Sequence, residues 1–480
     1  MTPLKRNADV LKGGFKAPSP KRVKGSEEKR QLTDRNIRFI RRRVSTDPGL
    51  PKIDLKDRDI EEMIMKGQPA SRPIEFTYAI SPLPKALDQG QSGKCWMTAG
   101  LGCLTMKILR RYDVPKDFEL SQSYLFFWDK FERANLFLNK MIKHRDKSLY
   151  DQKVASRLKL PLKDNGKPIN FIQLVKKYGV VPSTAQPENA HSMHSMQVNH
   201  YLNQYLRQFA LKIEDIKADE NTIDALKEET LAATWNFLVS CLGEPPESFQ
   251  FDYVKEGVSY SRNVTPLEFY NEYISKKRDD LVFVTNMPQE SAARSFHRFG
   301  PLRYNKHMAE GEKPVYLNLS FDTIVSCVIE SLKQGDPVCF SSDVCHQFSE
   351  DRALLDANLY NLDELFGKSL NFNLALKDED YFLNKGFEKP LPKGRGFLYE
   401  MTREDLIDTG EIRPRHVMVL CAVKLTEGGE PTHWLVLNSW GTEKNDGYLT
   451  MTHEWFLKYT LYCALDKRYL PKSLRAQSAV

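Results

Sequence analysis

One short glycine-containing segment carries the clearest chemical signal in the chain, Gln89-Gly90-Gln91-Ser92-Gly93-Lys94-Cys95-Trp96. Its two glycines permit a tight backbone turn, and Cys95 then opens a segment in which Leu101 and Leu104 recur at helical spacing. A thiol at a helix N-terminus has a lowered pKa, which favours the nucleophilic thiolate. The segment therefore predicts a cysteine nucleophile, with an inert buried thiol as the alternative.

A catalytic cysteine needs a base, and His416 and Asn438 lie at one end of a predicted β-hairpin. One apolar run begins at His416 and a second ends at Asn438, and turn-forming residues 426–431 separate them. Pairing about position 427 places His416 opposite Asn438, and a turn shifted by one residue would shift the partner by two. At either register the Asn438 amide oxygen can accept from the imidazole and fix its tautomer. Cys95, His416 and Asn438 are therefore the predicted catalytic residues.

The other histidines and the cysteines do not predict a metal site. His433 lies inside the second apolar run and is interpreted as a packed or edge residue. His191, His194 and His200 occupy a polar helical stretch without partner carboxylates at metal-ligand spacing. The eight cysteines contain no CxxC pair, and we interpret most of them as buried, reduced thiols. We therefore expect no metal and no other cofactor.

The elements that position the catalytic residues change from helices to strands along the chain. Apolar spacing is mainly helical over about 95–330, and continuous apolar runs bounded by Gly, Pro and Asn dominate about 335–465. This order predicts an α+β fold in which a helical part faces an antiparallel sheet. We expect three regions: a basic arm over 1–43, a helix-rich region with the Cys95 helix over 44–330, and a β-rich lobe with His416 and Asn438 over 331–480.

The positive charge of the chain is concentrated in the arm. Residues 1–43 contain fourteen Lys and Arg and four acidic residues, so the rest of a chain whose net charge is +7 is slightly negative. The Gly, Pro and charge content of the arm predicts disorder. The arm contains two basic clusters. The first resembles a nuclear-import signal and is Pro20-Lys21-Arg22-Val23-Lys24. The second could contact phosphates and consists of Arg38, Arg41, Arg42 and Arg43. Any nucleic-acid binding is predicted on residues 1–43, with a solvated basic tail as the alternative.

From the composition we expect neither a membrane span nor a secretory leader. The chain has 480 residues, 41% of them hydrophobic and 28% charged, which suits a globular protein of two lobes or one domain with large insertions. No run approaches the eighteen or so apolar residues of a membrane helix. The first thirty residues are basic and lack an apolar core. We therefore expect a cytoplasmic protein, or one that is also nuclear, without a membrane partner.

The motif residues resemble the papain-like cysteine peptidases. The resemblance rests on Gln-Gly-x-x-Gly-x-Cys-Trp at 89–96, on His416, and on Asn438-Ser439-Trp440-Gly441. It implies that Gln89 and the backbone N–H of Cys95 form an oxyanion hole, and that Trp440 shields the histidine–asparagine hydrogen bond from water. It also implies that Trp96 and Gly166 contact substrate. Ser92 stands where secreted members have a disulfide cysteine, which agrees with a reducing compartment.

The spacing narrows the resemblance to the bleomycin hydrolase branch of this group. Cys95 and His416 are 321 positions apart, whereas roughly 130–150 residues separate nucleophile and base in papain and cathepsins. Further segments in the order of that branch are Lys177-Tyr178-Gly179-Val180-Val181-Pro182, Gly243-Glu244-Pro245-Pro246-Glu247-Ser248-Phe249, Thr265-Pro266-Leu267-Glu268-Phe269-Tyr270, Leu359-Tyr360 with Leu365-Phe366-Gly367, and Met451-Thr452 before Trp455-Phe456.

The resemblance implies a papain-like core with large helical insertions, assembled as a barrel-shaped homohexamer whose active sites face an internal cavity. Its substrates would be unfolded peptides trimmed from the amino end, with a side activity on amide bonds such as that of bleomycin. Members of the branch are also associated with nucleic-acid binding. Aminopeptidase specificity in this branch depends on a C-terminal tail that enters the cleft. Here the resemblance is expected to stop near Lys472, so we expect a less strict preference for free amino termini.

Two departures and two rival functions complete the sequence-based picture. Gly166 lies in Asn165-Gly166-Lys167-Pro168, where the branch has Gly-Gly-Gln-Trp, and Arg415-His416-Val417-Met418 replaces Thr-His-Ala-Met. A catalytically weak scaffold or nucleic-acid-binding homologue would be expected to lose a catalytic residue, and none is lost. A transglutaminase-type acyltransferase usually has Asp as its third residue, whereas this chain has Asn438.

Overall fold

The computed structural model describes residues 32–46, 53–66, 74–215, 219–275, 281–288, 296–301, 306–311, 315–366 and 401–475. The chain divides into two compact units, Met1–Ile64 with Leu362–Tyr399, and Met65–Asn361 with Glu400–Val480. Every catalytic candidate lies in the second unit. This division differs from the predicted boundaries at 43 and 330, because residues distant in sequence share one sheet.

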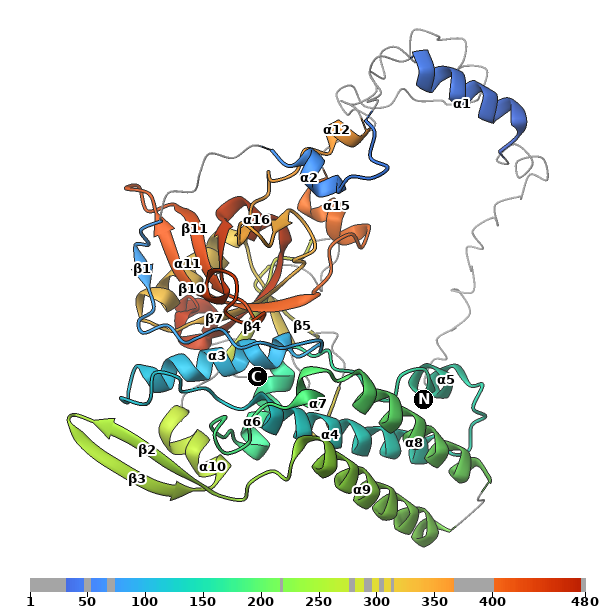
Figure 1. The fold of residues 1–480 in the computed structure, drawn as a ribbon, viewed down its shortest axis with the longest axis vertical. Helices are drawn as coiled ribbons and strands as arrows, with labels where there is room; N and C mark the ends of the chain where they lie inside the picture. Colours follow the sequence, from blue (N-terminus) through green and yellow to red (C-terminus); the bar gives the residue numbers. More distant parts are fainter. Residues whose placement is uncertain are drawn as a thin grey trace, which may run out of the picture. The chain divides into compact units, whose positions relative to one another are not determined.

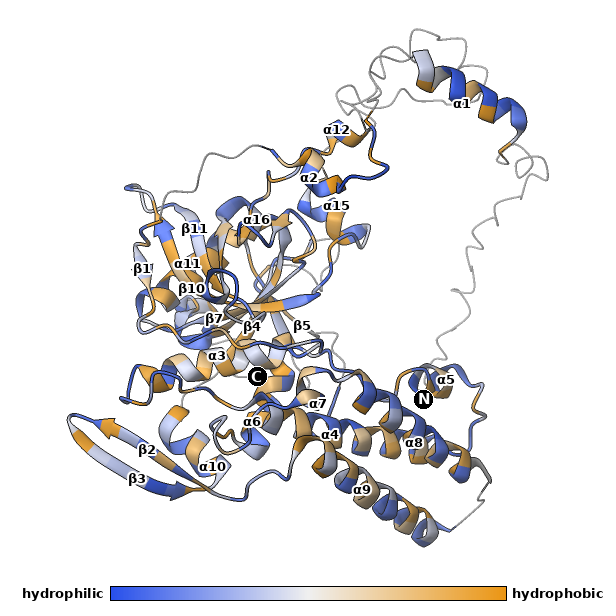
Figure 2. Ribbon diagram, in the orientation of Figure 1, coloured by the Kyte–Doolittle hydropathy of each residue, from blue (hydrophilic) through white to orange (hydrophobic). Residues whose placement is uncertain are grey.

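The described part of the first unit consists of three helices, α1 (Asp34–Thr46), α2 (Ile60–Ile64) and α12 (Asp363–Phe366). Helix α1 corrects the prediction that disorder extends to residue 43 (Figure 1). Ile37, Ile40 and Val44 recur at helical spacing, and the Thr33 hydroxyl accepts from the backbone N–H of Asn36 at the start of the helix. The described side chains of α1 are exposed, and Figure 2 shows hydrophilic residues over most of it. Residues 1–31, including the segment like a nuclear-import signal, lie outside the described residues.

The second unit begins its helical part with α3, which carries Cys95. Its members are α3 (Cys95–Leu109), α4 (Gln122–Lys143), α5 (Gln152–Leu158), α6 (Pro168–Tyr178), α7 (Ala190–Met193), α8 (Met196–Asp215), α9 (Glu220–Leu242), α10 (Pro266–Phe269) and the π-helix η2 (Tyr270–Ile274). Side chains cap several of these helices: Ser121 caps α4, Asp219 caps α9 and Thr265 caps α10. Helices α4, α8 and α9 pack on one another, away from the sheet (Figure 1).

The second unit also contains the strands of one large sheet. Eleven of the described strands form it, in the order β5 (Phe299–Pro301), β6 (Val315–Asn318), β4 (Leu281–Thr285), β13 (Thr460–Asp466), β7 (Val338–Ser342), β10 (His416–Leu425), β11 (Pro431–Leu437), β12 (Tyr448–Thr452), β9 (Leu354–Leu355) and β8 (Phe348–Ser349), with β1 (Tyr78–Ala79) also paired to β10. Most pairs are antiparallel, as predicted, but β4 with β6 and β12 with β9 are parallel.

Several strands fall where the sequence predicts mainly helices. Strands β2 (Phe249–Lys255) and β3 (Val258–Val264) form a separate antiparallel hairpin, and β4 to β6 join the large sheet before residue 331. Strand β4 pairs with β13, near the other end of the chain. Such short strands acquire their pairing from distant partners, so local spacing alone does not reveal them.

Helix α3 lies between the sheet and the other helices, which gives it contacts on nearly every side. It packs on β10 and β7 and also on α4 and α6, as Figure 1 shows. Twelve of its fifteen residues are buried, as expected for a helix that is apolar all round. The opposite face of the sheet is covered in part by α16 (His453–Tyr459), whose Phe456 contacts Phe340 of β7. The remaining helices are α11 (Phe321–Lys333), α15 (Arg403–Asp408), η4 (Asn445–Gly447), η5 (Lys467–Tyr469) and α17 (Lys472–Arg475).

Candidate active site

Cys95 is the first residue of α3, and its side chain is 9% exposed. The preceding residue, Lys94, holds the N-cap position but provides no side-chain hydrogen bond to the helix. The first backbone N–H groups of α3 therefore face the thiol, and those of Cys95 and Trp96 act on it together with the N–H of Val417. Because Val417 follows His416, the thiol lies at the start of β10, as the sequence predicts for a Cys–His pair.

Burial sets the protonation of the Cys95–His416 pair. It raises the pKa of the Cys95 thiol to about 11, although hydrogen bonds from backbone N–H groups oppose the shift. It also lowers the pKa of His416, against the effect of the hydrogen bond to Asn438. The prediction of a lowered thiol pKa is therefore wrong, since desolvation outweighs the helix N-terminus. Burial therefore favours the uncharged form of each group.

His416 and Asn438 are joined by a hydrogen bond of 2.8 Å between Nε2 and Oδ1. Because the amide oxygen only accepts, Nε2 carries the proton and Nδ1 is left as the proton acceptor. The predicted hairpin of β10 and β11 is present, but its register differs. Val419 pairs with Leu437, whereas pairing about position 427 would place Val419 opposite Leu435, two residues earlier. Two irregularities in the ladder, which resemble β-bulges, accompany this difference. His416 and Asn438 are still in contact, because His416 is the first residue of β10 and Asn438 directly follows the last residue of β11.

Trp440 stacks on the His416 ring, with centroids 5.2 Å apart and an angle of 29° between the planes. Its other contacts include the ring of Phe348 at 5.5 Å and an isolated backbone bridge to Asp88. The indole therefore covers the imidazole on one side, as the resemblance implies for a residue that excludes water from the His416–Asn438 hydrogen bond. That role for Trp440 remains a prediction.

Gln89 is held by two hydrogen bonds through its side-chain amide. Its Nε2 donates to the carbonyl of Ser92 at 2.8 Å, and its Oε1 accepts from the hydroxyl of Ser439 at 2.8 Å. The backbone N–H of Gln89 also donates to the carbonyl of Ser439. These bonds tie the loop before Cys95 to the residue after Asn438, and the second Nε2 proton remains for another acceptor.

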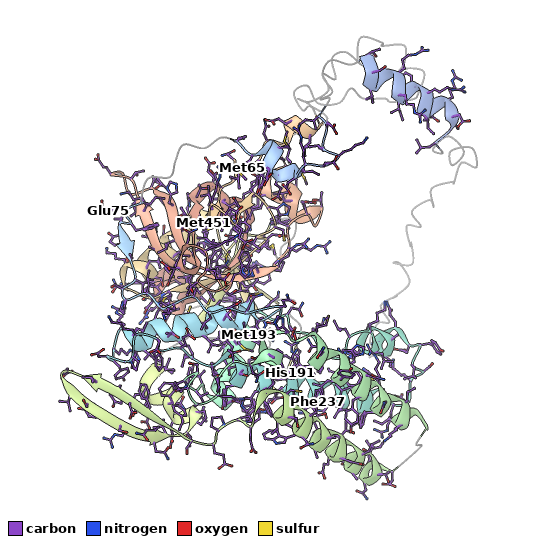
Figure 3. All side chains as sticks on the ribbon, viewed as in Figure 1. Met65, Glu75, His191, Met193, Phe237 and Met451 are labelled. Atoms are coloured by element: carbon purple, nitrogen blue, oxygen red, sulfur yellow. The ribbon has the colours of Figure 1, made fainter. Side chains whose placement is uncertain are left out.

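The loop from Gln89 to Cys95 also rests on helix α7. Gly90 has a φ of +58°, and a Cβ there would lie 2.4 Å from the carbonyl oxygen of Met193. Gln91 forms a backbone bridge with His194. Figure 3 labels Met193 and His191 of this helix. Glycine at position 90 is thus required by both backbone conformation and close packing, as the tight turn in the sequence predicts.

Trp96 and Gly166, the two predicted substrate contacts, lie against each other. The Nε1 of Trp96 donates to the carbonyl of Asp164 at 2.8 Å, and a Cβ on Gly166 would lie 2.5–2.9 Å from atoms of the indole. The ammonium of the next residue, Lys167, lies over the ring of Tyr462, 5.5 Å from its centroid. The structure thus brings Gly166 to the catalytic helix through Trp96, and contact of either residue with substrate remains a prediction.

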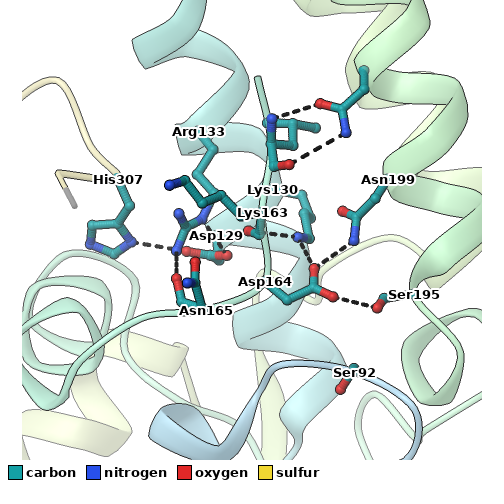
Figure 4. Close-up of polar contacts among 12 residues, drawn as sticks. Ser92, Asp129, Lys130, Arg133, Lys163, Asp164, Asn165, Ser195, Asn199 and His307 are labelled. Carbon is teal, nitrogen blue, oxygen red and sulfur yellow. Dashed lines mark hydrogen bonds and ion pairs between the residues drawn. The ribbon is translucent and has the colours of Figure 1, made fainter. Parts of the chain in front are cut away.

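A buried ionic cluster holds the Asp164 segment in place (Figure 4). Asp164 forms an ion pair with fully buried Lys130 and accepts from Ser195 at 2.5 Å and Asn199 at 2.7 Å. Burial alone would raise the pKa of Asp164, but Lys130 and these hydrogen bonds hold it well below its usual value. Arg133 donates to the carbonyl of Asn165 at 3.1 Å. The segment that carries Gly166 is therefore fixed from α4 and α8.

Sequence reasoning missed three residues that support the site: buried Ser439 and His307, and half-buried Asp164. His307 is fully buried, contacts Asp129 at 2.9 Å, and presents its ring edge-on to Trp96 with centroids 6.1 Å apart. Only Ser439 carried a local signal, as the residue after Asn438. Asp164 and His307 reach their partners from segments far apart in the chain, so no local pattern could identify them.

The other histidines that the sequence analysis weighed lie on β11, on or next to α7, and on α8. His433 is half-buried inside β11, opposite Lys424 and Thr452. His191 is half-buried on α7, and His194 and His200 are exposed. Among the residues that the structure describes, no group of three or more His, Cys, Asp or Glu could hold a metal ion. None of the described helices has the length and apolar character needed to cross a membrane.

The C-terminal segment is described as far as Arg475. Residues of α17 pack on the protein through buried Leu474, and Arg475 lines a cavity together with Lys107 and Arg110 at the C-terminal end of α3. Cys95 lies at the other end of that helix. Residues 476–480, the last part of the tail expected to enter the cleft, lie outside the described residues.

Comparison with known proteins agrees with this geometry. The chain matches the Peptidase C1-like family over residues 51–379 and 394–479, beyond the expected end of the resemblance near Lys472. It is 33% identical to Aminopeptidase C of Lactobacillus delbrueckii subsp. lactis over 395 residues, 81% of this chain and 80% of the relative. It is 31% identical to Aminopeptidase G of the same subspecies over 396 residues, 82% and 83% of the two chains.

A solved structure extends the similarity to the fold. The crystal structure of PepW from Lactobacillus rhamnosis HN001 superposes with a TM-score of 0.76 at 29% identity, covering 93% of this chain and 95% of the other. The predicted papain-like α+β fold with helical insertions is confirmed. The protein belongs to the Peptidase C1-like family, and it is a cysteine peptidase.

Proposed function

We propose that this protein is a cysteine aminopeptidase in which Cys95 is the nucleophile and His416 the base. The observation that carries the proposal is the 2.8 Å bond between His416 Nε2 and Asn438 Oδ1, at the strand end that faces the Cys95 thiol. That bond leaves Nδ1 as the acceptor for the thiol proton. The relatives named Aminopeptidase C support the choice of an aminopeptidase among cysteine peptidases.

The first half of the reaction forms an acyl-enzyme. Cys95 Sγ attacks the carbonyl carbon of the scissile peptide bond while its proton passes to Nδ1 of His416. The C–S bond forms as the carbonyl π-bond opens, and the negative charge develops on the former carbonyl oxygen. His416 then gives the proton to the leaving amine as the C–N bond breaks. A water molecule, deprotonated by His416, hydrolyses the thioester and restores the thiol.

Charge on the oxygen requires hydrogen-bond donors that are already in place. Gln89 Nε2 uses one proton on the Ser92 carbonyl, and its second proton can serve the oxyanion together with the backbone N–H of Cys95. Such donors, fixed before the reaction, supply a large share of transition-state stabilisation. Ser439 orients the amide so that nitrogen rather than oxygen faces the substrate.

The finer proposals concern substrate and assembly. We infer that peptides with a free amino terminus are the preferred substrates, that bleomycin-like amides are also hydrolysed, and that the chain assembles as a homohexamer. These inferences rest on the sequence resemblance to the bleomycin hydrolase branch. Sedimentation of the purified full chain tests the assembly, and a monomer at micromolar concentration would contradict the hexamer.

Nucleic-acid binding through the arm is a second candidate function, favoured by helix α1. Arg35, Arg38, Arg41 and Arg42 lie on this exposed helix, so several cations could contact neighbouring phosphates. Retention on a DNA column should fall with salt and be lost when residues 1–46 are removed, while peptidase activity remains. Equal retention with and without these residues would reject this function and leave the peptidase proposal untouched.

The aminopeptidase proposal is tested with paired fluorogenic peptides that differ only in a free or acetylated amino terminus. The full chain should cleave the free peptide faster, and Cys95→Ala should cleave neither. Removal of residues 476–480 preserves α17 and its buried Leu474, whereas removal from residue 473 would also disturb packing. If the tail restricts the cleft, the shorter truncation raises the blocked-to-free rate ratio. Equal rates on both peptides in the full chain would contradict an aminopeptidase.

A further inference from the structure

Two cysteines outside the catalytic site form a close thiol pair in the interface between α3 and the sheet. The Sγ atoms of Cys103 on α3 and Cys339 on β7 are 3.3 Å apart. Cys103 is half-buried and Cys339 is 9% exposed. We propose that Cys103 and Cys339 are an oxidation site at which a hydroperoxide forms a reversible disulfide between α3 and β7.

The geometry brings the sulfurs close to bonding distance. A disulfide has an S–S length of about 2.03–2.05 Å, so the two atoms need to approach by roughly 1.3 Å. A cavity of about 90 Å³ is lined by both cysteines and by Pro168, Phe171 and Ala464. It provides room for the side chains to rotate and for a small oxidant to reach Cys103, because half-buried Lys107 and exposed Lys176 also line it.

The neighbouring thiols are less suited to the reaction. Cys421 on β10 and Cys463 on β13 are fully buried, and neither lines the cavity. Cys339 has a raised pKa, chiefly because of its contact with Cys103 and then because of burial. The more accessible Cys103 is therefore the thiol that meets the oxidant first, and Cys339 is the one that resolves the product.

The chemistry balances with a hydroperoxide as the oxidant. The Cys103 thiolate attacks the distal oxygen of hydrogen peroxide, the O–O bond breaks, and sulfenic acid and water form. The Cys339 sulfur then attacks the sulfenic sulfur, the S–O bond breaks, and a second water leaves. In total, two thiols are oxidised to one disulfide, and one hydrogen peroxide is reduced to two water molecules. Dithiothreitol reverses the change by thiol–disulfide exchange.

The position of the pair connects it to catalysis. Helix α3 begins with Cys95, and Cys103 lies about two turns later on the same helix. On β7, Ser342 pairs with His416, and the hydroxyl of Ser341 donates to the His416 carbonyl at 3.2 Å. The disulfide would therefore link the helix that carries the nucleophile to the strand that supports the base. A small shift of α3 toward β7 changes the alignment of Cys95 with His416, and misplacement by about 1 Å can slow catalysis by up to 100-fold.

Mass spectrometry of the full chain carrying Cys95→Ser tests the bond without interference from the catalytic thiol. After treatment with hydrogen peroxide, alkylation and digestion without reductant, we expect a linked pair of peptides containing Cys103 and Cys339. The pair should separate on addition of dithiothreitol. Linkage of Cys339 to Cys421 or Cys463, or free alkylation of both Cys103 and Cys339 in the oxidised protein, would overturn the proposal.

Activity is tested in protein with its natural Cys95 shielded by a reversible peptide aldehyde during oxidation. Once the aldehyde is removed, kcat should be lower by at least about threefold, and dithiothreitol should restore it. Cys103→Ala and Cys339→Ala should each show no dithiothreitol-reversible loss, whereas Cys463→Ala should behave like the unaltered chain. A linked pair that leaves kcat unchanged would overturn the connection to catalysis, and an equal reversible loss in Cys103→Ala would overturn the assignment of the site.

Discussion

The hydroxyl of Ser439 donates a 2.8 Å hydrogen bond to Oε1 of Gln89, across 350 positions of the sequence. This contact links the loop that precedes the nucleophile to the strand end that carries the orienting asparagine. It also determines which end of the Gln89 amide can face a developing oxyanion. Ser439 is therefore a positioning residue for the oxyanion hole.

Ser439→Ala should lower kcat by about 2–10-fold, because one neutral hydrogen bond contributes about 0.5–1.5 kcal/mol. KM should change little, since the amide acts on the transition state more than on the bound substrate. Ser331→Ala is the matched control, because Ser331 is also buried and its hydroxyl also donates one hydrogen bond, to the carbonyl of Asp336. Equal loss of kcat in both variants would show that Ser439 acts only through stability.

His416→Ala should reduce kcat far more than Asn438→Ala. Loss of a general base costs about 10²–10⁴-fold. Loss of a hydrogen bond to a group that becomes charged costs about 1.5–3 kcal/mol, or roughly 10–150-fold. Steady-state kinetics on a peptide with a free amino terminus measures both. His433→Ala, on the neighbouring strand, should retain nearly full activity, and a comparable loss there would reject the choice of His416.

The rate of Cys95 alkylation should rise steeply with pH. Because burial holds the thiol pKa at about 11, the thiolate fraction increases about tenfold per unit between pH 7 and 9. Iodoacetamide labelling of the Cys95 peptide, followed by mass spectrometry, measures this rate. A rate that is flat between pH 5 and 8 would instead indicate a thiolate–imidazolium pair, and would contradict the raised pKa of the Cys95 thiol.

Gly166→Ala should lower kcat/KM and stability together. The added Cβ would lie 2.5–2.9 Å from the Trp96 indole, and overpacking of this kind costs about 1–3 kcal/mol. Gly428→Ala is the control, since its added atom would meet nothing closer than 3.6 Å and its φ is not in the left-handed region. Thermal unfolding and peptide kinetics measure both effects. A Gly166→Ala protein with unchanged unfolding and kinetics would contradict the close packing of Gly166 on Trp96.

The three residues of the proposed catalytic triad could be singled out from the sequence because their signals are local. The motif around Cys95 occupies eight residues. Pairing the two strands of one hairpin about its turn places His416 near Asn438. The exact register could not be predicted, because irregularities near Leu420 and Lys424 change the pairing without a distinctive sequence. Helix α1 was likewise missed, since the charge of the arm obscured the spacing of its few apolar residues.

Long-range features had no comparable signal. Strand β4 is positioned by pairing with β13, and the hydrogen bond between His307 and Asp129 joins residues 178 positions apart. The direction of the Cys95 pKa shift depends on how deeply the thiol is buried, and burial depth follows from the packing of α3 between sheet and helices. Residue types predict which groups react, whereas the protonation of those groups depends on tertiary structure.

The central claim is that Cys95 is the nucleophile of a peptidase, and one comparison tests it most directly. Hydrolysis of a fluorogenic peptide with a free amino terminus is measured for the full chain, for Cys95→Ala and for Cys421→Ala, a buried thiol on β10. We predict that Cys95→Ala abolishes hydrolysis while its thermal unfolding stays close to that of the unaltered chain, and that Cys421→Ala remains active. Undiminished hydrolysis by a folded Cys95→Ala protein would contradict the account.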